Sequence, residues 1–172
     1  MSGKKILMVV APKDFRDEEF LTPKGVFDDA GVQVTVASRG VSEARGVLGA
    51  KVRVDADLSS VSAQDFDAIV FVGGPGAQTY FNDSKALLLA KDAYTQGKVT
   101  AAICVAPTTL ANAGVLSKRK ATVWESSETV QALKRGGAVY TGEDVTVDGN
   151  VITANGPAAA GEFAEKILEA LG

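Results

Sequence analysis

Residues 98–107 read KVTAAICVAP and give the strongest indication of the fold. Residues 98–103 form a largely apolar run that predicts a strand buried on both faces of a sheet. Pro107 then suits the first turn of a helix. The single cysteine of the chain, Cys104, therefore falls on the turn between a strand and a helix. A side chain on such an elbow projects outward from the sheet.

Strand and helix patterns alternate on both sides of this elbow. Further strands are predicted at 5–11, 32–37 and 67–72, and helices at 18–30, 83–96, 107–113, 127–135 and 158–171, with Pro23 in the first turn of the first helix. We also expect short antiparallel strands within 40–58 and three short strands between 138 and 154. This alternation predicts one α/β domain over residues 1–172, with a mostly parallel sheet covered by helices on both faces.

The charge and length of the chain exclude several classes of protein. Its 172 residues carry 18 basic and 21 acidic side chains, for a net charge of -3. The longest basic run, 118–120, is interpreted as a solvated turn and leaves no electrostatic footprint for nucleic acid. The apolar run at 6–11 is too short for a signal peptide or a membrane span. Because a lone cysteine suits a reducing compartment, we expect a soluble cytoplasmic protein.

The chain contains no histidine, and this absence restricts its chemistry the most. Ser–His and Cys–His catalytic pairs are excluded. Zinc sites that rely on histidine are excluded too, because one cysteine cannot replace those ligands. Proton transfer near neutral pH must use carboxylates, the thiol, lysine, tyrosine or water. We expect neither a metal nor another cofactor.

The elbow and the glycine-rich loop at 73–76 suggest a reactive site, because ligands of open α/β sheets bind at the carboxyl ends of strands. The helix that follows Cys104 should lower the pKa of its thiol. The backbone amides of Gly74 and Val105 could together form an oxyanion hole. The alternatives are a buried structural cysteine and a simple tight turn. The loop reads GGPG and lacks the dinucleotide-binding pattern.

Three acidic residues, 17–19, stand at the start of the first predicted helix. Most acids in a first helical turn only compensate the helix dipole. One of the three could instead face the sulfur of Cys104 and serve as its acid or base.

Five segments of the chain occur together in one known family. They are residues 5–11, FRDEEFLTP at 15–23, GGPG at 73–76, AAICVAP at 101–107 and TANGP at 153–157. In their order and spacing, the chain resembles the DJ-1/PfpI superfamily over essentially its whole length. The resemblance implies a flavodoxin-like three-layer sandwich and a homodimer or larger ring. It also implies that Glu19, four residues before Pro23, reaches the elbow thiol, and that the oxyanion amides belong to Gly74 and Val105.

Several positions depart from that family pattern. Val105 stands where PfpI-type proteases carry a histidine, and Trp124 and Glu125 stand where some relatives carry another. Asn155 replaces an arginine that is common before the last Gly-Pro, and Arg16 replaces an acid. Arg16 could attract carboxylate substrates or form a surface salt bridge. Trp124 and Tyr80 could line the pocket, or lie in the core or a dimer contact.

The residues favour one function over three others. The leading hypothesis is a glyoxalase- or deglycase-like enzyme that acts on a small 2-oxoaldehyde such as methylglyoxal, with Cys104 as nucleophile and Glu19 as a slow acid/base. A redox or oxidative-stress sensor would need the same site, and a binding domain with a vestigial elbow is a further possibility. A PfpI-type cysteine peptidase is disfavoured, because expulsion of an amine calls for a general acid that is normally histidine.

Overall fold

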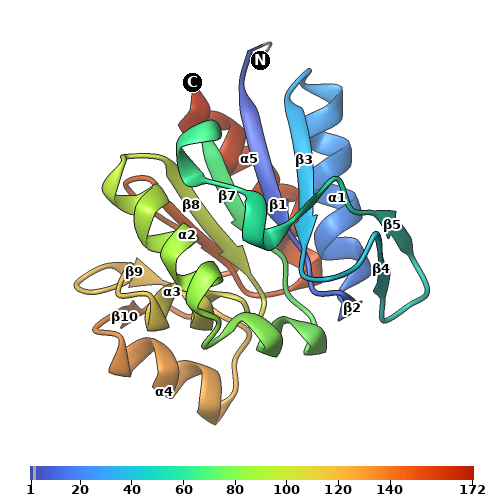
Figure 1. Ribbon diagram of the computed structural model, residues 1–172. Coiled ribbons are helices and arrows are strands. Elements are labelled where there is room, and N and C mark those ends of the chain that lie inside the picture. Colours follow the sequence, from blue (N-terminus) through green and yellow to red (C-terminus); the bar gives the residue numbers. More distant parts are fainter. Residues whose placement is uncertain (2) are drawn as a thin grey trace.

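A mostly parallel seven-stranded sheet forms the centre of the computed structural model, which describes residue 1 and residues 3–172 (Figure 1). Its strand order is β11-β12-β8-β7-β1-β3-β6, and the pairing is parallel except between β11 and β12. The strands are β1 (Lys5–Val9), β3 (Gln33–Ser38), β6 (Ala56–Asp57), β7 (Ala68–Phe71), β8 (Val99–Ile103), β11 (Val145–Asp148) and β12 (Val151–Ala154).

Helices cover both faces of this sheet. Helices α1 and α5 pack against each other on one face, and α2 and α3 lie on the other with α4 outside them (Figure 1). Their bounds are α1 (Asp17–Asp29), α2 (Ser84–Thr95), α3 (Pro107–Asn112), α4 (Ser127–Arg135) and α5 (Ala160–Leu171). The predicted flavodoxin-like three-layer sandwich is therefore confirmed. None of the described helices combines the length and apolar character needed to cross a membrane.

Smaller elements surround the main sheet. Strands β2 (Lys13–Phe15), β4 (Glu43–Gly46) and β5 (Lys51–Arg53) form one small sheet, and β9 (Lys120–Ala121) and β10 (Val139–Tyr140) form another. The described residues also form four 3₁₀ turns: η1 (Leu58–Ser60), η2 (Ala63–Asp65), η3 (Pro75–Tyr80) and η4 (Pro157–Ala159). The expected antiparallel pair within 40–58 is β4 and β5, whereas β6 pairs parallel with β3. The sequence did not predict β2 or β9.

The predicted place of Pro23 is wrong. Helix α1 begins at Asp17, so Pro23 lies in its interior and is buried. Proline has no N–H, and the helical hydrogen bond that would end on the Glu19 carbonyl cannot form. The buried face of α1 includes Phe20 and Phe27. Its tertiary packing keeps the helix continuous at Pro23 despite the missing hydrogen bond.

The buried acid Asp17 attaches α1 to the β4–β5 hairpin. Its two carboxylate oxygens accept hydrogen bonds of 2.8 Å from the backbone N–H groups of Leu48 and Ala50. The carboxylate also lies against Gly46, where a Cβ would lie 2.5 Å from Asp17 Cγ. Asp17 therefore fixes the loop of the hairpin and does more than compensate the helix dipole.

We expect Asp17→Ala to lower the free energy of unfolding by about 1–3 kcal/mol, because two amides lose a charged acceptor. Urea denaturation followed by circular dichroism measures this loss. The control is Asp29→Ala, at an exposed position near the end of the same helix, for which we expect a change within about 0.5 kcal/mol. An equal effect of the two substitutions would contradict the assignment.

Candidate active site

Cys104 occupies a strained backbone position at the end of β8. Its φ is 65°, in the left-handed region that residues other than glycine rarely adopt. Two hydrogen bonds hold it there: the Cys104 N–H donates to the Ala154 carbonyl at 2.8 Å, and the Cys104 carbonyl accepts from the Trp124 N–H at 2.8 Å. The surrounding structure therefore imposes the elbow, as backbone strain of this kind requires.

The loop after β7 lies directly against the elbow and against the loop after β2. Gly74 has a φ of 107°, and a Cβ there would overlap the backbone of Phe15 and Arg16. The Arg16 N–H donates to the Gly73 carbonyl at 2.9 Å. The amides of Gly74 and Val105 both donate toward the Cys104 sulfur. These two amides are the ones that the sequence assigned to an oxyanion hole.

The Glu19 side chain is buried beneath this loop and has an exposed fraction of 0%. Both of its carboxyl oxygens lack a hydrogen-bond partner among the residues that the structure describes. A Cβ at Gly73 would lie 2.5 Å from Glu19 Oε1 and 2.6 Å from Cys104 Cβ. The carboxyl and the thiol thus meet over the same face of Gly73, and only glycine leaves room for both.

A pocket of about 340 Å³ opens above these groups. It is lined by Arg16, Glu19, Gly74, Pro75, Cys104, Val105, Trp124 and Pro157. Six of these are residues that the sequence singled out. Pro75 and Pro157 were not, although both stand inside motifs quoted for the family resemblance. The volume suits a small molecule or one end of a larger one.

Burial controls the ionisation of the pair. It raises the pKa of Glu19 to about 7, against the smaller lowering effects of the nearby thiol and of Arg16. Burial and the charge of Glu19 raise the pKa of Cys104 to about 12, although the amides of Gly74 and Val105 act in the opposite direction. The predicted net lowering of the thiol pKa is therefore wrong. The reason is that α3 begins three residues after Cys104, and desolvation outweighs the amides.

Between these two pKa values the pair holds one proton and one negative charge, which belong to both groups together. The amides of Gly74 and Val105 act on the sulfur and the amide of Gly73 acts on the carboxyl, but burial raises the pKa of the thiol further above that of the carboxyl. The first proton therefore leaves Glu19 near pH 7, and the negative charge lies on its carboxylate. The Cys104 thiol keeps the second proton, beside an ionised Glu19 that can accept it.

Arg16 and Glu18 neutralise each other at the mouth of the pocket. The Arg16 guanidinium binds the Glu18 carboxylate through two hydrogen bonds of 2.9 Å. This is the surface salt bridge that the sequence offered as one interpretation of Arg16. Among the three acids at 17–19 only Glu19 lines the pocket, because Asp17 binds the β4–β5 hairpin and Glu18 pairs with Arg16.

Trp124 and Asn155 have different relations to the site. Trp124 is 51% exposed and forms one wall of the thiol pocket. Asn155 lies outside that pocket, in a neighbouring hollow of about 350 Å³ that Trp124 also lines. Its side-chain amide donates to Asp144 at 3.2 Å. The structure therefore does not bring Asn155 to the thiol.

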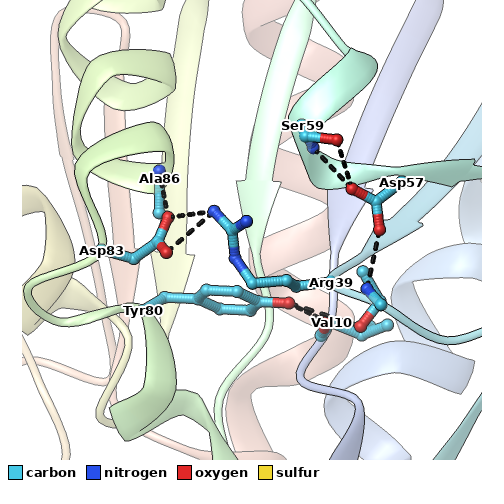
Figure 2. Close-up of polar contacts among 9 residues, drawn as sticks. Val10, Arg39, Asp57, Ser59, Tyr80, Asp83 and Ala86 are labelled. Carbon is cyan, nitrogen blue, oxygen red and sulfur yellow. Dashed lines mark hydrogen bonds and ion pairs between the residues drawn. The ribbon is translucent and has the colours of Figure 1, made fainter.

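Tyr80 is buried away from the pocket, contrary to the alternative that it lines it. Figure 2 shows its hydroxyl directed at the Val10 carbonyl, to which it donates at 2.9 Å. Beside it, the Arg39 guanidinium binds Asp83 at 2.8 Å (Figure 2). Tyr80 ends η3, which follows the glycine loop, so this cluster anchors that loop to the carboxyl ends of β1 and β3. No periodicity of the sequence signals this contact.

The fold and the site define a flavodoxin-like α/β protein with a cysteine on a strained strand-to-helix elbow and a buried carboxyl beside it. The chain belongs to the DJ-1/PfpI family, whose model matches residues 4–170. A ThiJ/PfpI domain protein from Brachyspira murdochii has a very similar structure, with a TM-score of 0.93, 36% identity and 98% coverage of both chains.

Some relatives with similar sequences are named as enzymes, and another is named only as an uncharacterized protein. An uncharacterized protein of Methanocaldococcus jannaschii is 45% identical over 99% of this chain and 84% of its own. A glutathione-independent glyoxalase of Caenorhabditis elegans is 30% identical, with coverage of 98% and 89%. A deglycase of Pyrococcus horikoshii is 31% identical, with coverage of 90% and 91%.

The raised pKa of Glu19 makes the stability of the protein depend on pH. A buried acid whose folded-state pKa is about 7, against 4.5 unfolded, stabilises the fold most below pH 4.5 and loses this contribution as the pH rises through 7. The loss amounts to about 3 kcal/mol. We expect Glu19→Gln to remove it, so that the variant is more stable than the wild type at pH 8 and similar at pH 4.5. Denaturant titrations at both pH values test this, and a parallel pH dependence in the two proteins would contradict it.

Proposed function

We propose that the chain is a cysteine-dependent enzyme of glyoxalase or deglycase type that converts 2-oxoaldehydes such as methylglyoxal to 2-hydroxy acids. The observation that carries this proposal is the buried Glu19 carboxyl, without a hydrogen-bond partner among the described residues, beside the Cys104 thiol in a small pocket. A nucleophile, a proton carrier and two amide donors are the groups that such a reaction needs.

In the first step the Glu19 carboxylate takes the thiol proton as the Cys104 sulfur adds to the aldehyde carbon, and the C=O electron pair moves to the oxygen. The amides of Gly74 and Val105 stabilise this oxyanion. Glu19 gives its proton to the oxygen, which leaves a hemithioacetal and an ionised carboxylate. The site thereby holds one negative charge before and after the addition.

In the second step the Glu19 carboxylate removes the remaining hydrogen of the former aldehyde carbon as a proton, which leaves an enediolate. A proton then returns to the neighbouring carbon, and the hemithioacetal becomes a thioester. The aldehyde carbon is oxidised by two electrons and its neighbour is reduced by two, so no external oxidant is required. Water hydrolyses the thioester, releases the 2-hydroxy acid and restores the thiol.

Three further features support parts of this proposal. The relatives named glyoxalase and deglycase match the chain over most of both lengths. The lone thiol suits a reducing cytoplasm, in which we place the protein. Leu21 on α1 and Leu48 on the β4–β5 hairpin are 53% and 63% exposed, which is consistent with a homodimer or larger assembly through this side.

The oxidation-sensor alternative depends on the same groups. Oxygen atoms added to the Cys104 sulfur would find the amides of Gly74 and Val105 and a protonated Glu19 as donors. Turnover separates the two functions. Peptide hydrolysis is not proposed, because the chain has no histidine to protonate a leaving amine.

We expect purified protein to convert methylglyoxal to lactate, measured by loss of the aldehyde and enzymatic detection of the acid. Cys104→Ser should abolish turnover, and Glu19→Gln should lower kcat by about 100-fold or more because the proton carrier is lost. Asp29→Asn removes an exposed carboxyl near the far end of α1 as a control and should retain most of the activity. Absence of turnover in the wild type would refute the proposed enzyme and leave the sensor or a vestigial site.

The reaction rate should also report the ionisation of the pair. Because the Glu19 base forms by loss of the first proton, kcat/KM should rise with pH through about 7 and reach a plateau above it. In the Glu19→Gln variant the rise of kcat/KM with pH should no longer occur near pH 7. A wild-type profile that is flat between pH 5 and 9 would contradict the assignment.

A further inference from the structure

A second hollow opens next to the thiol pocket and is larger than it. This groove, of about 590 Å³, lies between η3, α3 and α4. It shares Pro75, Val105 and Trp124 with the pocket of about 340 Å³ around Cys104. The two hollows thus have common walls, and a molecule that reacts at the sulfur can extend into the groove.

The side chains of the groove are mostly neutral hydrogen-bonding groups and aromatic rings. The neutral polar ones are Gln78, Asn82, Thr108, Asn112, Ser126, Thr129 and Gln131, and the aromatic ones are Phe81 and Trp124. The Asn112 amide is occupied, since it donates to the Phe81 carbonyl at 2.8 Å, and the Ser126 and Thr129 hydroxyls are bonded to each other at 2.9 Å in the cap of α4. Within the part of the chain that the structure describes, the side chains of Gln78 and Gln131 make no hydrogen bond. They remain available to a ligand.

Thr108 gives the groove an unusual feature. Its side chain lines the groove, its exposed fraction is only 6%, and its hydroxyl has no hydrogen-bond partner among the described residues. A buried hydroxyl without a partner is costly to a fold. Rotation about χ1 of Thr108, in the first turn of α3, offers the hydroxyl to a ligand in the groove. A methyl group, such as that of methylglyoxal, would leave it unpaired.

The charged residues argue against a strongly ionic ligand. Glu128 and Arg135 carry opposite charges and stand two turns apart on α4, where each complements its end of the helix dipole. Amide and hydroxyl side chains both donate and accept, which matches the hydroxyl groups of a sugar. Aromatic faces pack against the C–H groups of the same molecules. The lining therefore favours a neutral polyhydroxylated ligand.

We propose that the groove binds the polyhydroxylated tail of a sugar-derived 2-oxoaldehyde whose aldehyde carbon reacts at Cys104. This inference rests on the proposed function and specifies its substrate class. The steps are those given above, with the sugar chain in place of the methyl group. The aldehyde carbon is oxidised, the neighbouring ketone is reduced, and water releases an aldonic acid.

The test compares glucosone, a 2-oxoaldehyde with a hydroxylated tail, with methylglyoxal. We expect the wild type to show a kcat/KM for glucosone about ten-fold or more above that for methylglyoxal, since each well-placed hydrogen bond to the tail contributes to specificity. Thr108→Val, which replaces the hydroxyl with a methyl of similar size, should lower the glucosone-to-methylglyoxal ratio about ten-fold. Gln131→Ala, at an exposed position, should do the same.

Gln64→Ala, at an exposed position in η2 away from both hollows, is the control and should leave the ratio unchanged. Turnover of methylglyoxal without a preference for glucosone, or a ratio unaffected by the groove variants, would overturn this inference and leave the proposed function intact. If neither aldehyde is turned over, the proposed function fails, and glucosone binding to Cys104→Ser is measured by NMR. Shifts of the Gln78 and Gln131 side-chain amides would support the groove, and their absence would overturn it.

Discussion

The constraint on which this active site depends is a carboxyl group buried without a hydrogen-bond partner among the residues that the structure describes. Glu19 lies beneath the glycine loop with its Oε1 against Gly73, and desolvation raises its pKa to about 7. Stability alone would favour a neutral side chain at this position. The thiol of Cys104 makes the carboxyl useful, because the pair can hold one proton and one charge near neutral pH.

The backbone around this pair is arranged to keep the two groups together. The left-handed conformation of Cys104 is held by β12 on one side and by the Trp124 amide on the other. Glycines at 73 and 74 let the loop after β7 approach both Glu19 and the backbone of Arg16. Tyr80 and the Arg39–Asp83 ion pair then fix that loop to the sheet (Figure 2). Each of these contacts is local. Together they bring the ends of β2, β7 and β8 close to one sulfur.

Sequence reasoning found the fold and the centre of the site because both follow from local patterns. Apolar runs and helix signals located the main strands and the five α-helices, and the elbow and glycine loop located the thiol. Glu19 was separated from Glu18 only by the family spacing to Pro23. The predictions that were wrong concern features that tertiary contacts determine. Packing carries α1 through Pro23, burial reverses the direction of the thiol pKa shift, and Asp144 holds Asn155 outside the pocket. Thr108 had no assigned role, because an unpaired hydroxyl is visible only in three dimensions.

The Glu19–Cys104 pair loses its first proton near pH 7, and this proton leaves the carboxyl. Because Cys104 is the sole cysteine, the ultraviolet absorbance of its thiolate can be followed against pH without interference from other thiols. The infrared carbonyl band of protonated Glu19 is recorded in parallel and assigned with Glu19→Gln. We expect the carbonyl band to disappear through about pH 7, while the thiolate absorbance rises only toward pH 12. Thiolate absorbance that rises near pH 7 while the carbonyl band persists would place the charge on the sulfur and contradict this assignment.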